Sequence, residues 1–309
     1  MYIEKRKSGK NIKYYLVHSY REKNKVEKIR KYLGFNLSKE ELKRKKEKAE
    51  KIILDILEEI NIKVFSFTLT KKQVKILNNF NNKIQVVHLS KKEWENFTED
   101  FVYNTNAIEG STITEEEVKE ILDEKPRTKE PEEIETLGVA KAVEYIRKTK
   151  EDLSLNLLLK LHNFCFKGSK SFAGKFRNVN VVVRNSRGDI LHAGVPKEEL
   201  KDYLNEFIKW YKENKNKFKP LILSAIIHNQ FEHIHPFQDG NGRVGRLLLN
   251  YILLKNNYPP INIMLEDRQE YYKSLQKYSK QDDLKPTLRL LIKQYKKTLK
   301  EVSTKKKKR

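Results

Sequence analysis

The sequence predicts a mainly α-helical protein with a small β-hairpin inside its helical part and a β-hairpin plus a charged helix near its N-terminus. From residue 69 onward, apolar residues recur at intervals of three and four, which is the spacing of amphipathic helices. Two regions depart from this pattern. Residues 12–17 with 25–33, and residues 179–183 with 190–192, are rich in β-branched and aromatic side chains and flank polar turns, which indicates paired strands.

The expected helices follow from this periodicity and from their end signals. The N-terminal helix begins after Ser38, with Glu41 three residues later in a capping box, and it runs to about residue 59. Further helices are expected over residues 71–80, 91–101, 114–123, 131–148, 154–166, 197–214, 221–234, 243–256, 268–280 and 286–302.

Basic residues are concentrated at the ends of the 309-residue chain. Of the formal net charge of +23, residues 1–50 contribute 17 Lys and Arg against 7 Asp and Glu, and the last five residues are all basic. This distribution favours a central domain with basic appendages over a protein built around a nucleic-acid groove. We therefore expect a basic N-terminal appendage over residues 1–60, a helical domain over 61–300 and a disordered basic tail over 301–309.

Composition excludes several classes of protein. A hydrophobic fraction of 38%, with 14 Phe and 15 Tyr, excludes a wholly disordered chain. No apolar stretch approaches the ~20 residues that cross a bilayer, and the first residues lack the apolar core of a secretory signal. Cys165 is the single cysteine, so an internal disulfide and a Cys-based zinc cage are excluded and a cytoplasmic location is expected.

The residues that carry chemistry lie at 235–246, in a polar connection between two apolar helices. The small residues Gly240 to Gly242 let a ligand touch the main chain. The helix that follows presents unpaired N–H groups, which form an anion site. Arg243 and Arg246 are three residues apart on one helix face, where two guanidinium groups suit a polyphosphate.

Two further residues of this segment complete a reaction centre. Asp239 beside a polyphosphate indicates Mg²⁺, which prefers one or two carboxylates together with phosphate oxygens. The imidazole of His235 can accept a proton from a hydroxyl group at neutral pH. A base, an anion site, a cation and two arginines are together the groups that an active site for phosphoryl or nucleotidyl transfer uses.

This segment resembles the Fic (Fido) family, whose motif H-P-F-x-[D/E]-G-N-G-R-x-x-R is matched by residues 235–246 at every defined position. The resemblance extends to residues 173–183, which are similar to the family's approach to its flap. It also extends to residues 257–261 and 270–272, which are similar to the region around adenine, and it covers about residues 70–300. It implies a helical bundle with a β-hairpin flap that transfers AMP from Mg-ATP to a Ser, Thr or Tyr hydroxyl of a target protein, which can be the enzyme itself.

The resemblance assigns roles to individual residues. His235 would be the general base and Asp239 would position Mg²⁺. Arg243 and Arg246 would hold the β- and γ-phosphates, and Tyr272 would lie beside the adenine. The expected ATP-binding set is Asp239, Gly240, Asn241, Gly242, Arg243, Val244, Gly245, Arg246 and Tyr272.

Residues 105–110 resemble the family's inhibitory motif [S/T]-x-x-x-E-[G/N], in the position of members that inhibit themselves from an N-terminal helix, here around residues 98–110. Glu109 opposite Arg246 would neutralise the charge meant for the γ-phosphate. In some relatives this Glu also supports removal of AMP from the target. The structural alternative is a plain helix end, with Gly110 as the residue after the C-cap.

Other interpretations stay open or are disfavoured. A metal site of His228, His233, His235 and Asp239 is disfavoured because His228 and His233, five residues apart, point in different directions on a helix. His162 beside Cys165 is better explained by core filling than by a Cys/His nucleophile.

The open functional alternatives are a nucleotide-sensing regulator that binds nucleic acid through the basic N-terminal region, and a Fic enzyme that uses another donor such as UTP or CDP-choline or that transfers phosphate as a kinase does. An intact His235 argues against a pure sensor. An oligomer is also left open.

Overall fold

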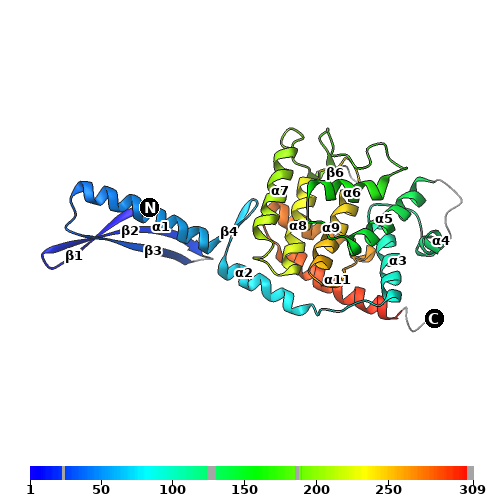
Figure 1. Ribbon diagram of the computed structural model, residues 1–309, viewed down its shortest axis with the longest axis horizontal. Coiled ribbons are helices and arrows are strands. Elements are labelled where there is room, and N and C mark those ends of the chain that lie inside the picture. Colours follow the sequence, from blue (N-terminus) through cyan, green and yellow to red (C-terminus); the bar gives the residue numbers. More distant parts are fainter. Residues whose placement is uncertain (23–24, 124–129, 185–187, 189, 305–309) are drawn as a thin grey trace. The chain divides into compact units, whose positions relative to one another are not determined.

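The structure is a computed structural model that describes residues 1–22, 25–123, 130–184, 188 and 190–304 (Figure 1). It divides into two compact units, residues 1–75 and 76–309, which are described separately. The prediction of a mainly helical chain with small hairpins is confirmed. Within the described residues, no helix combines the length and the apolar character needed to span a membrane.

The first unit is a three-stranded antiparallel sheet packed against one helix, followed by a short hairpin. Leu16 and Leu33 of the sheet form a core with Ala49 and Ile53 of the helix. The elements are β1 (Tyr2–Ser8), β2 (Asn11–Glu22), β3 (Lys25–Phe35), α1 (Lys39–Ile60), β4 (Asn61–Val64) and β5 (Phe67–Thr70).

Local signals explain most of this unit. The capping box at the start of α1 is present, because Glu41 N–H donates to Ser38 Oγ at 3.2 Å and Ser38 N–H donates to Glu41 Oε2 at 3.0 Å. Strand β1 was not expected. Its polar sequence lacks the alternation that identifies a strand, and its pairing with β2, from Tyr2 opposite Val17 to Ser8 opposite Asn11, makes it one.

The second unit is a helical bundle in which α8 packs along α9, with α7, α10 and α11 against α8 and α3, α5 and α6 against α9. Its elements, beginning with the helix that crosses the unit boundary, are α2 (Lys71–Asn78), η1 (Asn79–Lys83), α3 (Lys91–Ile108), α4 (Glu115–Asp123), α5 (Pro131–Lys148), α6 (Leu155–Phe166), β6 (Val182–Arg184), β7 (Ile190–Ala193), α7 (Leu200–Asn214), α8 (Pro220–Ile234), α9 (Asn241–Lys255), η2 (Leu265–Asp267), α10 (Arg268–Gln281) and α11 (Lys285–Thr304).

The central position of α8 and α9 follows from their composition. Nearly every residue of both helices is buried, on all sides of the helix axis, so neither can lie at the surface. The polar loop between them is therefore held at the end of a buried helix pair. Strands β6 and β7 pair antiparallel as the predicted hairpin, and residues 185–187 and 189 of its turn lie outside the described residues.

The expected domain boundaries remain predictions. The division of the structure at Lys75 and Ile76 leaves β4 and β5 with the first unit, whereas the sequence analysis places the boundary at residue 60. Helix α11 extends to Thr304, and residues 305–309 of the expected tail lie outside the described residues.

Candidate functional site

The loop between α8 and α9 is shaped by two left-handed residues and one side-chain clamp. Helix α8 ends at His235 with φ of 54°, and Gly240 precedes α9 with φ of 80°. Asn241 clamps the loop, since its Oδ1 accepts from Phe237 N–H and its Nδ2 donates to Phe237 O, both at 2.8 Å. A Cβ on Gly240 would lie 2.2 Å from the Phe166 ring, so only glycine fits there.

The loop leaves the start of α9 available to a ligand. An α-helix has no intrahelical partners for its first N–H groups, and the N-cap residue of this helix, Gly240, has no side chain that could bond to them. The side chain of Asn241 is used within the loop, so its contribution to an anion site is its main-chain N–H. The sequence analysis assigned this segment to anion binding on the same grounds.

His162 of α6 contacts the loop between α8 and α9 and holds it in position. Its ring stacks on Phe237 at 3.9 Å, and its Nδ1 accepts from Gly174 N–H at 2.8 Å. Nε2 therefore carries the proton and donates to the main-chain oxygen of Asp239 at 3.1 Å. Burial lowers the pKa of His162 to about 4, so the ring is neutral at pH 7. His162 is more than core filling, because it fixes the loop, while Cys165 is fully buried.

His235 is a neutral imidazole at pH 7. Its Nδ1 lies 3.2 Å from the main-chain oxygen of Glu232, which can only accept, so Nδ1 carries the proton and Nε2 keeps its lone pair. Burial lowers its pKa to about 4, with a further contribution from His192 of the flap, whose ring lies 5.6 Å away. The main chain of His235 is held by Arg177, whose Nε donates to His235 O at 2.7 Å.

Arg177 is a residue whose role the sequence analysis did not identify. It is buried, and it also donates to the main-chain oxygens of Val179 and Val195, at 2.8 and 2.5 Å. These bonds tie both ends of the flap region to the base. The sequence gives no sign that Arg177 bonds to these main-chain oxygens, because Val195 and His235 are far from it along the chain.

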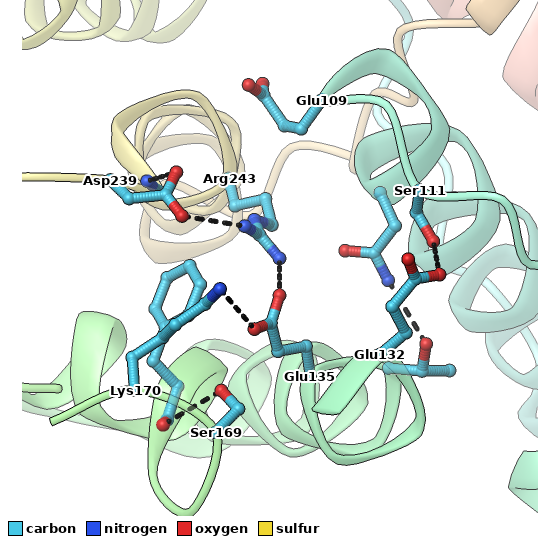
Figure 2. A network of polar contacts seen from close by, with 12 residues as sticks. Glu109, Ser111, Glu132, Glu135, Ser169, Lys170, Asp239 and Arg243 are labelled. Carbon is cyan, nitrogen blue, oxygen red and sulfur yellow. Dashed lines mark hydrogen bonds and ion pairs between the residues drawn. The ribbon is translucent and has the colours of Figure 1, made fainter. Parts of the chain in front are cut away.

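Asp239 lies at the edge of the site with a half-exposed side chain. Its Oδ1 accepts from Gly240 N–H at 2.6 Å, and its Oδ2 is 3.9 Å from Arg243 Nη2 (Figure 2). Among the residues that the structure describes, no group of three or more His, Cys, Asp or Glu side chains is placed to hold a metal ion. His228 and His233 instead contact Tyr271 and Ser279.

Arg243 is buried and already paired. Its Nη1 donates to Glu135 Oε2 of α5 at 2.5 Å, and its guanidinium lies 4.3 Å from the centre of the Phe166 ring (Figure 2). Lys170 lies 3.7 Å from the other oxygen of Glu135. The sequence analysis missed Glu135. Glu135 lies four residues before the buried Val139 and therefore on the same apolar face of the helix. An acidic residue on an apolar face was the sequence feature that could have indicated a buried charged pair.

Arg246 is 2% exposed and is held from α3. Its Nε donates to Thr105 Oγ1 at 2.7 Å and its Nη2 donates to Thr105 O at 2.9 Å and to Glu109 Oε1 at 2.7 Å, while Nη1 has no hydrogen-bond partner among the residues that the structure describes. Glu109 is the residue after α3. A Cβ on Gly242 would lie 2.1 Å from Glu109 Oε1, so this carboxylate sits against the first turn of α9. The pairing of Glu109 with Arg246 that the sequence analysis expects is present.

A second carboxyl group near Arg246 is neutral. Burial raises the pKa of Glu232 to about 8, and its buried Oε1 has no hydrogen-bond partner in the described part of the chain. This oxygen lies against Gly245, where a Cβ would be only 2.1 Å from it. Gly245 therefore serves close packing, and Val244 is fully buried in the core.

Some of these residues line a cavity of about 780 Å³, whereas Arg243, Glu135 and Lys170 line a neighbouring pocket. The 780 Å³ cavity is lined by His235, the first turn of α9, Arg246 and Glu109 on one side, and by the flap and α10 on the other. Tyr272 of α10 lines it too, and its hydroxyl donates to Ile108 O at 3.1 Å. The volume is within the range of ligand pockets of ~300–1,000 Å³.

Comparisons with known proteins agree with this geometry. Residues 152–253 match the model of the Fic/DOC family. The chain is 30% identical over 199 residues to the protein adenylyltransferase Fic of Nematostella vectensis, covering 62% of this chain and 45% of that protein. It is 30% identical over 203 residues to the protein adenylyltransferase fic-1 of Caenorhabditis elegans, covering 62% and 39%. The chain thus spans less than half the length of these relatives.

Solved structures show the same fold. Residues 134–508 of C. elegans Fic-1 superpose with a TM-score of 0.62 at 22% identity, covering 89% of this chain and 80% of that one. A Fic family protein from Desulfovibrio desulfuricans G20 gives a TM-score of 0.65 at 24% identity, covering 78% and 76%.

Proposed function

We propose that this chain, which carries a Fic/DOC domain at residues 152–253, is a protein adenylyltransferase that moves AMP from ATP to a protein hydroxyl and is held back by Glu109. One observation carries the proposal. A neutral imidazole with an available Nε2 and the N-terminus of α9, whose N-cap is a glycine, open into the same cavity, and the carboxylate of Glu109 lies against that N-terminus.

The site residues divide the reaction between them. His235 Nε2 accepts the proton as the target oxygen bonds to the α-phosphorus, and the bond from that phosphorus to the bridging oxygen breaks to release pyrophosphate. The N–H groups of Asn241 and Gly242 would face the developing negative charge, while Gly240 N–H donates to Asp239 Oδ1 at 2.6 Å and would join them only if that bond opened. The base is neutral at pH 7 because burial depresses its pKa, so no proton must leave it first.

Asp239 fits a magnesium ion held mainly by phosphate oxygens. Its half-exposed carboxylate lines the cavity, and a single carboxylate suffices for Mg²⁺ bound in this way. Mg²⁺ would neutralise charge on the phosphates. Arg246 would take the γ-phosphate only when Glu109 leaves its Nη2, whereas Arg243 keeps Glu135 as its partner.

The partner that this reaction requires is a protein with an accessible hydroxyl side chain, and the enzyme can serve as its own target. The same site would also support hydrolytic removal of AMP, in which a water oriented by Glu109 bonds to the α-phosphorus, the bond from that phosphorus to the target oxygen breaks, and AMP and the free hydroxyl are released. We place the protein in the cytoplasm, as its single buried cysteine suggests.

The test is mass spectrometry of the purified chain after incubation with ATP and Mg²⁺, in a Glu109→Gly background. We expect one added AMP per modified site, no addition after His235→Ala, and normal addition after His88→Ala, which changes an exposed histidine outside the site. Calorimetry should show that ATP still binds the His235→Ala variant. Label from UTP or CDP-choline but not from ATP, or undiminished transfer by His235→Ala, contradicts the proposal.

A further inference from the structure

The β1–β3 sheet has one covered face and one open face. Leu16 and Leu33 point to α1, which lies along the sheet (Figure 1). Residues opposite each other in antiparallel strands share a face, so the register assigns the other side chains. Arg6, Lys13 and Phe35 form one row across the open face, and Tyr15 and Tyr32 lie in the next row.

Two exposed aromatic residues, Tyr32 and Phe35, and the half-buried Tyr15 lie on this open face. The rings of Tyr15 and Tyr32 are 5.3 Å apart, and the guanidinium of Arg6 is 5.5 Å from the centre of Tyr15. Tyr32 is 50% exposed and Phe35 is 60% exposed. Aromatic rings on an uncovered sheet face remain in contact with water and gain no burial energy, and a group of such exposed apolar side chains is typical of a binding surface.

Cations accompany these rings. Arg30 lies in the third row, opposite Val17, and both Arg6 and Arg30 are held by Glu4, at 2.6 and 3.1 Å, which fixes the two guanidinium groups above the sheet. Residues 1–75 contain 22 Lys and Arg against 10 Asp and Glu, and residues 76–309 contain 43 against 32 over three times the length. The first unit is therefore the more strongly cationic part of the chain.

We propose that the open face of the β1–β3 sheet binds single-stranded nucleic acid, with Arg6, Lys13 and Arg30 on phosphates and Tyr15, Tyr32 and Phe35 beneath bases. Charge alone would suit any polyanion. Rings interleaved with cations are the combination that binds single strands, because unpaired bases stack on exposed aromatic faces while the backbone follows the positive charge. This inference is independent of the proposed transferase activity.

The test uses fluorescence anisotropy of the full chain with a labelled random-sequence 20-nucleotide strand, its duplex and anionic vesicles. For three phosphate contacts on a single strand, affinity should fall about 20-fold between 50 and 200 mM salt. Tyr32→Ala should weaken binding about tenfold by removing one stacking contact. His235→Ala should bind as the wild type does.

Two triple variants, each of which removes three positive charges, distinguish binding by this face from a general effect of the positive charge of the first unit. Arg6→Gln, Lys13→Gln and Arg30→Gln together should abolish binding at 200 mM salt. Lys43→Gln, Arg44→Gln and Lys48→Gln remove the same charge from exposed positions of α1 and should cost much less. Circular dichroism verifies that each variant is folded. The proposal is overturned by absent binding at 50 mM salt, by equal losses in both triple variants, by full affinity of Tyr32→Ala, or by tighter binding to duplex or vesicles.

Discussion

Arg243 and Arg246 lie in the first two turns of one helix, yet carboxylates hold them in different ways. The pair of Arg243 with Glu135 joins two helices and is enclosed, with side-chain exposures of 8% and 10%. The pair of Arg246 with Glu109 is enclosed at the arginine, 2% exposed, and open at the glutamate, 29% exposed. Glu109 also precedes Gly110, whose φ is 97°. The pair of Arg243 with Glu135 therefore stabilises the packing of α9 on α5. In the pair of Arg246 with Glu109, we expect that a ligand anion can replace the carboxylate.

Glu232 explains why the exchangeable partner comes from α3. This carboxyl group lies near Arg246, but burial raises its pKa to about 8 and leaves it neutral at pH 7. A neutral carboxyl group does not satisfy the charge of Arg246. The charged partner in this part of the described structure is Glu109, which approaches from the cavity.

The largest expected effect concerns stability. Glu135→Ala should lower the free energy of unfolding by about 3–5 kcal/mol, because it leaves Arg243 buried without its charged partner. Glu109→Ala should cost about 1 kcal/mol or less, since Arg246 then faces the cavity and keeps both bonds to Thr105. Urea unfolding of the two variants measures the difference. Equal losses would remove the distinction between the pairs.

The second prediction concerns pH. Burial raises the folded pKa of Glu232 to about 8, above its ordinary value of 4.5, so its contribution to stability is full below pH 4.5 and is lost as pH rises through 8. Glu232→Gln has no such loss. Relative to the wild type it should gain about 1.4 kcal/mol per pH unit between pH 5 and 7.5. Urea unfolding at several pH values measures this, with the exposed Glu130→Gln as control, and parallel pH profiles would show that Glu232 is charged.

The sequence predicted the helices well and the partners of the site poorly. Periodicity located α5 and α8 nearly to the residue, because one apolar stripe or an all-apolar run determines each. It ended α3 too early, at residue 101, because Asn104 and Thr105 are polar. They are buried and bonded, Asn104 to Leu265 N–H and Thr105 to Arg246.

The same limit applies to the site. The motif at residues 235–246 was enough to predict the loop, the candidate base His235 and the candidate anion site, because all three depend on residues that are close together in the sequence. It could not give Glu135 as the partner of Arg243, because 108 residues separate them and only the packing of α5 on α9 brings them together.

The smallest expected effect concerns the loop after Glu109. Glu132 Oε2 accepts from Ser111 Oγ at 2.8 Å and from Thr112 N–H at 3.3 Å, which ties this loop to α5 (Figure 2). Glu132→Ala should raise self-adenylylation about threefold by loosening Glu109, in line with the net value of about 0.5–1.5 kcal/mol for one hydrogen bond. Glu130→Ala, which removes a charge from the same helix start, is the control. Equal rates for the two variants would exclude this role of Glu132.

The central claim is that Glu109 blocks the site by holding Arg246, and the rate of self-adenylylation of Glu109→Gly with ATP and Mg²⁺ tests it most directly. Freed Arg246 can take the γ-phosphate and align the α-phosphate, so the rate should rise about tenfold or more over the wild type. The rise should disappear in the double variant with His235→Ala, and the melting temperature should change little. A Glu109→Gly protein no more active than the wild type, on itself and on proteins of a cell lysate, would contradict the claim and leave Glu109 as a helix-end carboxylate.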